Sequence, residues 1–159
     1  MNKTKNVFIS HHSKDEEHIN KLKELLSPKG YNIKNSSIES SKDDGARKSE
    51  NVIKRLLRMR IHWAGTFVCL IGTQTHTREW VDWEIDQANK KGKRIVGVFT
   101  HGASNSDVPE NLEKYRDALV GWNSDKIIDA IEGRINSSEN PDGTPRAGKW
   151  KPVKEQCDS

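Results

Sequence analysis

Short apolar runs alternate along this chain with segments of helical periodicity, and this alternation restricts the fold more than any other feature. Uninterrupted apolar runs of roughly four to eight residues are typical of strands that are buried on both faces of a sheet. The predicted strands are residues 6–10, 31–33, 66–71, 94–99 and 118–121. Strands joined by helices in strict alternation predict an α/β fold, in which helices cover both faces of a central, mainly parallel sheet.

The helices are predicted from apolar residues that recur three and four positions apart between the strands. The first helix begins at the N-cap Ser13, with Glu16 completing a capping box, and Pro28 and Gly30 end it. The last helix is predicted to be capped by Ser124. The core stripes of four predicted helices are Ile19, Leu22, Leu25 and Leu26; Val52, Ile53, Leu56 and Leu57; Val81, Ile85 and Ala88; and Ile127, Ile128, Ile131 and Ile135.

Polar residues follow several of the predicted strands, at the edge of the sheet where the strands end. Parallel sheets with helices on both faces bind their ligands at the carboxyl ends of the strands. Ser10 and His11 stand at the end of the first strand, and the loops 35–45, 72–77 and 100–101 follow later strands. We therefore expect these residues to surround a cleft at this edge.

Trp80 and Glu84 lie four residues apart in the helix predicted to follow the strand 66–71. Four residues are about one helical turn, so the two side chains share a face, beside the core stripe that contains Ile85. An indole can stack on a flat ring, and a carboxylate can hold a sugar. Most helix glutamates simply face solvent, so the residues alone leave a catalytic and a structural interpretation of Glu84 open.

The composition disfavours several classes of protein. No apolar run approaches the roughly 20 residues of a membrane span and no secretion signal opens the chain, so a cytoplasmic protein without membrane association is expected. The formal charge of +4 comes from basic residues that are mixed with acidic ones, which disfavours nucleic-acid binding. Cys69 lies in a predicted strand and Cys157 in a polar tail, so neither a disulfide nor a metal site is expected.

Several familiar catalytic and nucleotide-binding motifs are missing. The chain has no GxGxxG after its first strand, no GxxxxGK[ST] and no nucleophile elbow. The third strand ends Leu70-Ile-Gly72, without the Asp that a phospho-acceptor domain needs. The adjacent His11 and His12 are poorly spaced for a metal, and two interpretations remain for them, polar loop residues or ligand contacts.

Five motifs in the expected order resemble a TIR domain. They are Val7-Phe-Ile-Ser10 with Asp15 and an amphipathic helix; Gly30-Tyr-Asn-Ile33 with a polar loop; Leu70-Ile-Gly-Thr-Gln-Thr75; Trp80-Val-Asp-Trp-Glu-Ile85, with the family's W-x-x-x-E-I signature; and Lys93-Arg-Ile-Val-Gly-Val98. Together they cover roughly residues 5 to 136. The short bacterial TIR-like proteins of Thoeris anti-phage defence are the most similar subgroup. The resemblance implies a flavodoxin-like three-layer fold with a five-stranded sheet.

The resemblance also implies an activity, which is cleavage of NAD⁺ at the bond between nicotinamide and ribose, with no metal. It makes Glu84 the catalytic residue, places Phe8, Ser10, His11 and Trp80 against the dinucleotide, and makes the loop 35–45 close the site. In Thoeris-like members a ribose hydroxyl attacks, and the cyclic ADP-ribose isomer is a diffusible signal to a separate effector. A neighbouring protomer often completes such a site, so the resemblance implies a homo-oligomer.

Two other functions are kept as alternatives. One is a non-catalytic TIR-like scaffold, which would assemble through the helix of Glu84 and the loop 35–45. The other is an enzyme like the nucleoside 2-deoxyribosyltransferases, which share the fold and a glutamate nucleophile. The chain is predicted to divide into a TIR-like domain at residues 1–136 and a polar, flexible C-terminal tail at 137–159.

Overall fold

Five parallel strands form one sheet in the computed structural model, which describes residues 6–11, 16–35, 50–73, 79–100 and 102–146. The strand order is β2-β1-β3-β4-β5, the order of flavodoxin-like folds. The strands are β1 (Asn6–Ser10), β2 (Asn32–Asn35), β3 (Thr66–Ile71), β4 (Arg94–Phe99) and β5 (Ala118–Val120). All five strands predicted from the sequence are therefore confirmed, with β2 shifted by one to two residues.

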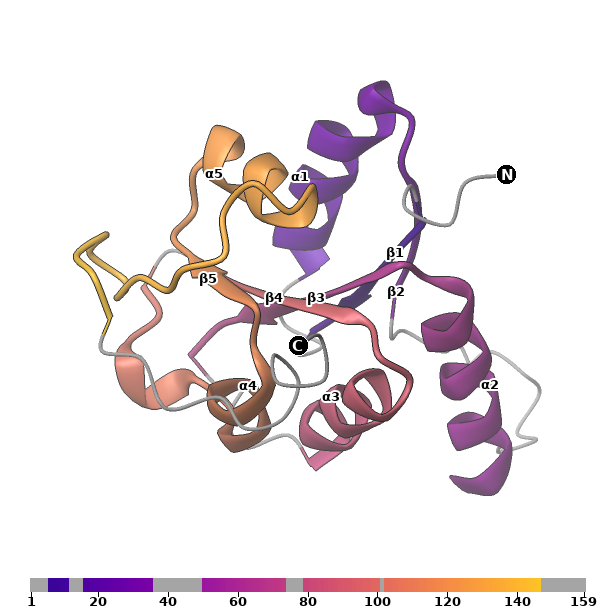
Figure 1. Cartoon of the computed structure of the whole chain (residues 1–159). Helices are drawn as coiled ribbons and strands as arrows, with labels where there is room; N and C mark the ends of the chain where they lie inside the picture. Colours follow the sequence, from indigo (N-terminus) through magenta and orange to yellow (C-terminus); the bar gives the residue numbers. More distant parts are fainter. Residues whose placement is uncertain (1–5, 12–15, 36–49, 74–78, 101, 147–159) are drawn as a thin grey trace, which may run out of the picture.

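Helices cover both faces of the sheet and make three layers (Figure 1). One face is covered by α1 (Glu16–Leu26) and α5 (Ser124–Ile131). The other is covered by α2 (Glu50–Trp63), α3 (Glu79–Lys90) and α4 (Glu110–Tyr115). Two short 3₁₀ helices, η3 (Ser27–Lys29) and η6 (Asn105–Asp107), complete the described elements. The predicted three-layer α/β architecture is confirmed.

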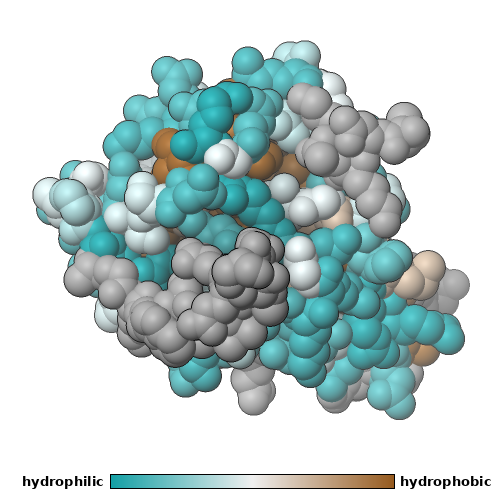
Figure 2. All heavy atoms as spheres, viewed as in Figure 1, coloured by the Kyte–Doolittle hydropathy of each residue, from teal (hydrophilic) through white to brown (hydrophobic). Residues whose placement is uncertain are grey.

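The central strands are buried because each layer supplies apolar side chains to them. Successive residues of β1 point to opposite faces, so Val7 and Ile9 pack with α1 and α5, whereas Phe8 packs with α2 and α3. Cys69 is fully buried in β3 and carries a free thiol, as predicted for a core residue. Hydrophilic side chains cover most of the molecular face in Figure 2, as expected from a charged fraction of 31%.

Gly97 lets β4 approach its neighbours closely. A Cβ added there would lie 2.5 Å from Leu119 Cδ1 and 2.9 Å from Leu112 Cδ2, and both leucines are fully buried. We expect Gly97→Ala to lower the free energy of unfolding by about 1–3 kcal/mol through overpacking. Urea denaturation measures this cost. Gly121→Ala is the control, because the nearest atoms to its Cβ are 3.9 Å away; an equal loss in both variants would contradict the packing argument.

The start of α5 corrects one prediction. Asn123, not Ser124, is the N-cap, because its side chain accepts a hydrogen bond from Lys126 N at 3.0 Å. Ser124 is therefore the first residue inside the helix. The predicted cap of the first helix, Ser13, lies outside the described residues.

Residues 137–146 run beside the edge strand β5. Leu119 N donates to Ser137 O at 3.1 Å, and Glu139 N donates to Leu119 O at 2.8 Å. Arg116, which is 4% exposed, donates through Nε to Ser138 Oγ at 2.7 Å. These bonds join the first part of the predicted tail to the sheet edge. The division at residue 136 and the flexibility of 137–159 stay predictions, and residues 147–159 lie outside the described part.

Candidate active site

A buried carboxylate on α3 lies against the end of β1. Glu84 is 2% exposed, and its Oε1 accepts a hydrogen bond of 2.5 Å from Oγ of the fully buried Ser10. Ser10 is the last residue of β1, so this pair lies at the carboxyl edge of the sheet. Val81, Ile85 and Ala88 anchor α3 in the core, which turns the adjacent Glu84 toward the end of β1.

The Ser10 hydroxyl offsets part of the cost of burying Glu84. Removing a carboxylate from water costs several kcal/mol, and a buried carboxylate is retained only where hydrogen bonds or charges compensate. A hydrogen bond from a hydroxyl to a carboxylate is among the stronger ones in proteins. A buried ionisable group at the ligand-binding edge of a parallel sheet is a candidate for chemistry rather than for stability.

Two tryptophans stand beside this carboxylate on α3. Trp80 is half-buried, one turn before Glu84, and its ring meets that of Trp83 edge-on with 5.7 Å between centroids. Lys54 Nζ from α2 lies 5.9 Å from the Trp80 ring centroid and 5.7 Å from that of Trp83. The site therefore has an aromatic side with a cation over it, a surface suited to a flat, anionic ligand.

The structure brings together some of the predicted site residues and places Phe8 in the core. Ser10 and Glu84 are in contact, and His11 follows directly, 3% exposed. Trp80 shares the helix of Glu84, as its spacing predicted. Phe8 is instead fully buried in the core, where it stacks on Phe67 at 5.5 Å between centroids. Phe8 lies on the same face of β1 as Ser10, the face covered by α2 and α3, and its contact with a ligand stays a prediction.

Several predicted site segments lie outside the described residues. They are His12, residues 36–45 of the predicted closing loop, residues 74–77, and His101. Thr100 is described, and its Oγ1 donates to Ile71 O at 3.0 Å, which ties the ends of β3 and β4 together. Trp83 and Lys54 were not predicted as site residues. The spacing of Trp83 from Trp80 was a readable signal, whereas Lys54 comes from a different helix.

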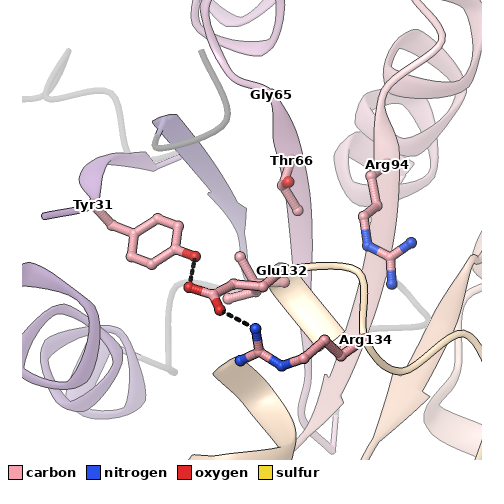
Figure 3. A pocket seen from close by; sticks show the side chains of 7 residues that line it. Tyr31, Gly65, Thr66, Arg94, Glu132 and Arg134 are labelled. Atoms are coloured by element: carbon pink, nitrogen blue, oxygen red, sulfur yellow. Dashed lines mark hydrogen bonds and ion pairs between the residues drawn. The ribbon is translucent and has the colours of Figure 1, made fainter. Parts of the chain in front are cut away.

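A hollow of about 510 Å³ lies at the other end of the strands, away from Ser10 and Glu84 (Figure 3). Thr66 and Arg94, the first residues of β3 and β4, line it with Tyr31, Glu132 and Arg134. The Tyr31 hydroxyl donates to Glu132 Oε2 at 2.7 Å, and Arg134 pairs with Glu132 Oε1 at 2.7 Å.

The polar groups of this hollow hold the fold together. Arg94 donates to Ala130 O, Asn136 Oδ1 and Ile135 O at 2.6–2.8 Å, which fastens the end of α5 to β4. Burial lowers the pKa of the Arg94 guanidinium below its ordinary value. Because Arg94 and Glu132 already bind groups of the chain, we interpret the hollow as a structural junction.

Tyr31→Phe tests this interpretation. Burial, and next the hydrogen bond to Glu132, raise the pKa of the Tyr31 phenol above its ordinary value. The stabilising contribution of the hydroxyl is thus complete below about pH 10 and is lost as the pH rises above it. We expect the variant to lose about 1 kcal/mol of unfolding free energy at pH 7 and less in alkaline solution. A cost that is unchanged above pH 10, in urea titrations at each pH, would contradict this.

The described residues hold neither a metal-binding cluster nor a membrane-spanning helix. Within the described ranges, no three His, Cys, Asp or Glu side chains gather so that they could hold a metal ion. No described helix is both long enough and apolar enough to cross a membrane.

A family model for the TIR-like domain of the Thoeris protein ThsB matches residues 8–105. This chain belongs to that family. The match begins in β1 and contains Ser10, Trp80 and Glu84, so the TIR-like domain holds the whole candidate site. The resemblance and the flavodoxin-like fold predicted from the sequence are both confirmed.

One curated relative of this TIR-like domain comes from Bacillus cereus (strain MSX-D12) and is named "Putative cyclic ADP-D-ribose synthase ThsB1". The two are 34% identical over 56 residues, which are 35% of this chain and 29% of the relative. The chain therefore matches less than a third of the relative's length, and the activity of the whole relative enters only as a proposal below.

Solved structures share the fold at low sequence identity. A conserved protein from Enterococcus faecalis V583 has a TM-score of 0.58 at 13% identity, covering 82% of this chain and 98% of its own. The CMP N-glycosidase BcmB of Clostridium botulinum has 0.53 at 17%, covering 82% and 99%. The TIR domain of the Toll-related receptor TRR-2 from Hydra magnipapillata has 0.52 at 17%, covering 80% and 91%. These likenesses concern the fold alone.

Proposed function

We propose that this TIR-like protein cleaves NAD⁺ and forms a nucleotide signal in bacterial anti-phage defence. The observation that carries the proposal is the buried Glu84, which Ser10 holds at the carboxyl edge of the sheet beside Trp80. The name of the Bacillus cereus relative, a cyclic ADP-D-ribose synthase, supports NAD⁺ as the substrate.

Glu84 acts on the ribose in this proposal. The bond between the ribose C1′ and the nicotinamide nitrogen breaks, and its electron pair leaves with nicotinamide, which becomes neutral. The ribose then carries oxocarbenium-like positive charge, which a carboxylate stabilises directly or through the ribose hydroxyls. A hydroxyl of the same molecule attacks C1′ and loses its proton, which gives a cyclic ADP-ribose isomer; attack by water gives linear ADP-ribose.

In this proposal the residues next to Glu84 bind the dinucleotide and position the Glu84 carboxylate. Trp80 stacks on a ring of the dinucleotide, and the buried His11 shapes the floor of the site. Ser10, which the sequence suggested as a ligand contact, acts through Glu84, because its hydroxyl already donates to Oε1. We propose further that the protein works in the cytoplasm, that a neighbouring protomer completes the site, and that the product acts on a separate effector.

A substrate panel tests the proposal against its alternatives. Concentrated protein is incubated with NAD⁺, with CMP, and with deoxynucleosides plus free bases, and the products are separated by chromatography. We expect turnover of NAD⁺ alone. Base exchange between deoxynucleosides without NAD⁺ turnover would identify a deoxyribosyltransferase, and release of cytosine from CMP would identify a nucleotide N-glycosidase. No turnover of any substrate, in infected-cell lysate as well, would favour the scaffold.

A further inference from the structure

A shallow groove of about 780 Å³ runs along α2 and reaches the start of β1. Arg55, Arg58, Met59 and His62 line it, and they are spaced so that they share one helical face. Trp63 at the end of α2, Lys91 just after α3 and Asn6 at the start of β1 also line it. The opposite side of α2, with Leu57 and Ile61, is buried against the core. Glu84 is not among the described residues that line the groove.

The groove is positively charged through Arg55, Arg58 and Lys91. None of the described residues that line it is Asp or Glu. Among the described residues, Arg55 and Lys91 make no side-chain ion pair, and Arg58 contacts only the ring of Trp83, with Cζ 5.8 Å from the centroid. Seven other cations of the described chain are paired with acids: Lys21, Lys90, Lys114, Arg116, Lys126, Arg134 and Arg146. An anionic partner would therefore find, gathered in this groove, three basic side chains without an acidic partner among the described residues.

The groove also carries exposed apolar surface. Met59 is 61% exposed. In the described part of the chain it is the only large hydrophobic side chain that is exposed rather than buried or half-buried. Cations at the end of a helix interact with its dipole, which accounts for His62 in the last turn of α2. That effect is confined to the last turn, so it explains neither Arg55 and Arg58 nor the exposure of Met59.

We propose that this groove binds an acidic segment of another protein. Carboxylates of the segment would pair with Arg55, Arg58 and Lys91, and an apolar side chain would pack on Met59 and Trp63. Arg, Met and Trp are enriched at protein–protein interfaces, and Met adapts its shape to different partners. The proposal does not depend on NAD⁺ cleavage.

Two other occupants fit less well. Single-stranded nucleic acid is bound on several aromatic side chains, but Trp63 is the only Trp, Tyr or Phe among the described residues that line the groove. A second copy of this chain would need to supply free carboxylates. Many of its described acids are already paired within the chain, including Glu17, Asp86, Glu110, Glu113 and Glu139.

Selection from a random peptide library displayed on phage tests the proposal. The full-length protein is the target, the double variant Arg55→Glu, Arg58→Glu is the counter-target, and anisotropy of labelled synthetic peptides gives each Kd. We expect the enriched peptides to combine several Asp or Glu with an apolar residue. The double variant should weaken their binding at least about tenfold, and Met59→Ala about threefold.

The control variant is Lys21→Glu, which makes the same replacement of a cation by Glu at one position of α1, across the sheet from the groove. It should bind within about twofold of the wild type. Circular dichroism of each variant verifies the fold. The proposal is overturned if no peptide is enriched, if the enriched peptides are not acidic, or if they bind the double variant equally well. Tighter binding of a single-stranded DNA oligonucleotide of equal charge would overturn it in favour of nucleic acid.

Discussion

Glu84→Gln is expected to reduce NAD⁺ turnover about 10²–10³-fold while leaving the protein folded. The amide has nearly the shape of the carboxylate but carries no charge, so it cannot stabilise positive charge on the ribose. It can still accept the hydrogen bond from Ser10. Because the variant no longer buries a charge, its free energy of unfolding should equal or exceed that of the wild type. Thermal unfolding and nicotinamide release are the two measurements.

A matched change elsewhere controls for loss of a negative charge. Glu24→Gln removes a carboxylate from the exposed side of α1, on the sheet face opposite α3, and should keep full turnover. Wild-type turnover in Glu84→Gln would show that the carboxylate is not the catalytic group. Low turnover accompanied by a large fall in the melting temperature would show that Glu84 serves the fold instead.

Ser10→Ala is expected to reduce turnover about tenfold to a hundredfold. A hydrogen bond to a charged group contributes about 1.5–3 kcal/mol, and each 1.4 kcal/mol of lost stabilisation is about a factor of ten in rate. Because we propose that Ser10 holds the carboxylate rather than binding substrate, we expect the loss in kcat more than in KM.

A double-mutant cycle separates positioning from ligand contact. If Ser10 acts only through Glu84, then Ser10→Ala should change little once Glu84 is Gln. An additive loss in the double variant would mean that the serine contacts the substrate independently, as the sequence resemblance first suggested.

The sequence predicts the fold well because the determinants are local. Apolar runs such as 66–71 and the stripe of Val81, Ile85 and Ala88 report directly which side of each element is buried. The cap of α5 was placed one residue late because Asn123 and Ser124 are both good N-caps, and only the hydrogen bond to Lys126 distinguishes them.

The candidate site was only partly predictable because its contacts are not local. The helical period placed Trp80 and Glu84 together, but 74 residues separate Ser10 from Glu84, and no spacing shows that they bond. Phe8 was assigned to the ligand from the family resemblance, and the structure shows it buried on the α2/α3 side of β1, so its contact with a ligand stays a prediction. The groove on α2 could be found only from the structure, which leaves Met59 exposed.

The most direct test of the central claim is mass spectrometry of NAD⁺ incubated with the wild type and with Glu84→Gln. Each is assayed alone and in lysate of phage-infected cells that express it. We expect the wild type to release nicotinamide together with an ADP-ribose product, which is lighter than linear ADP-ribose by one water if it is cyclic. We expect Glu84→Gln to release at least about a hundredfold less of both. Equal release by the two proteins, or none by the wild type in either condition, would contradict it.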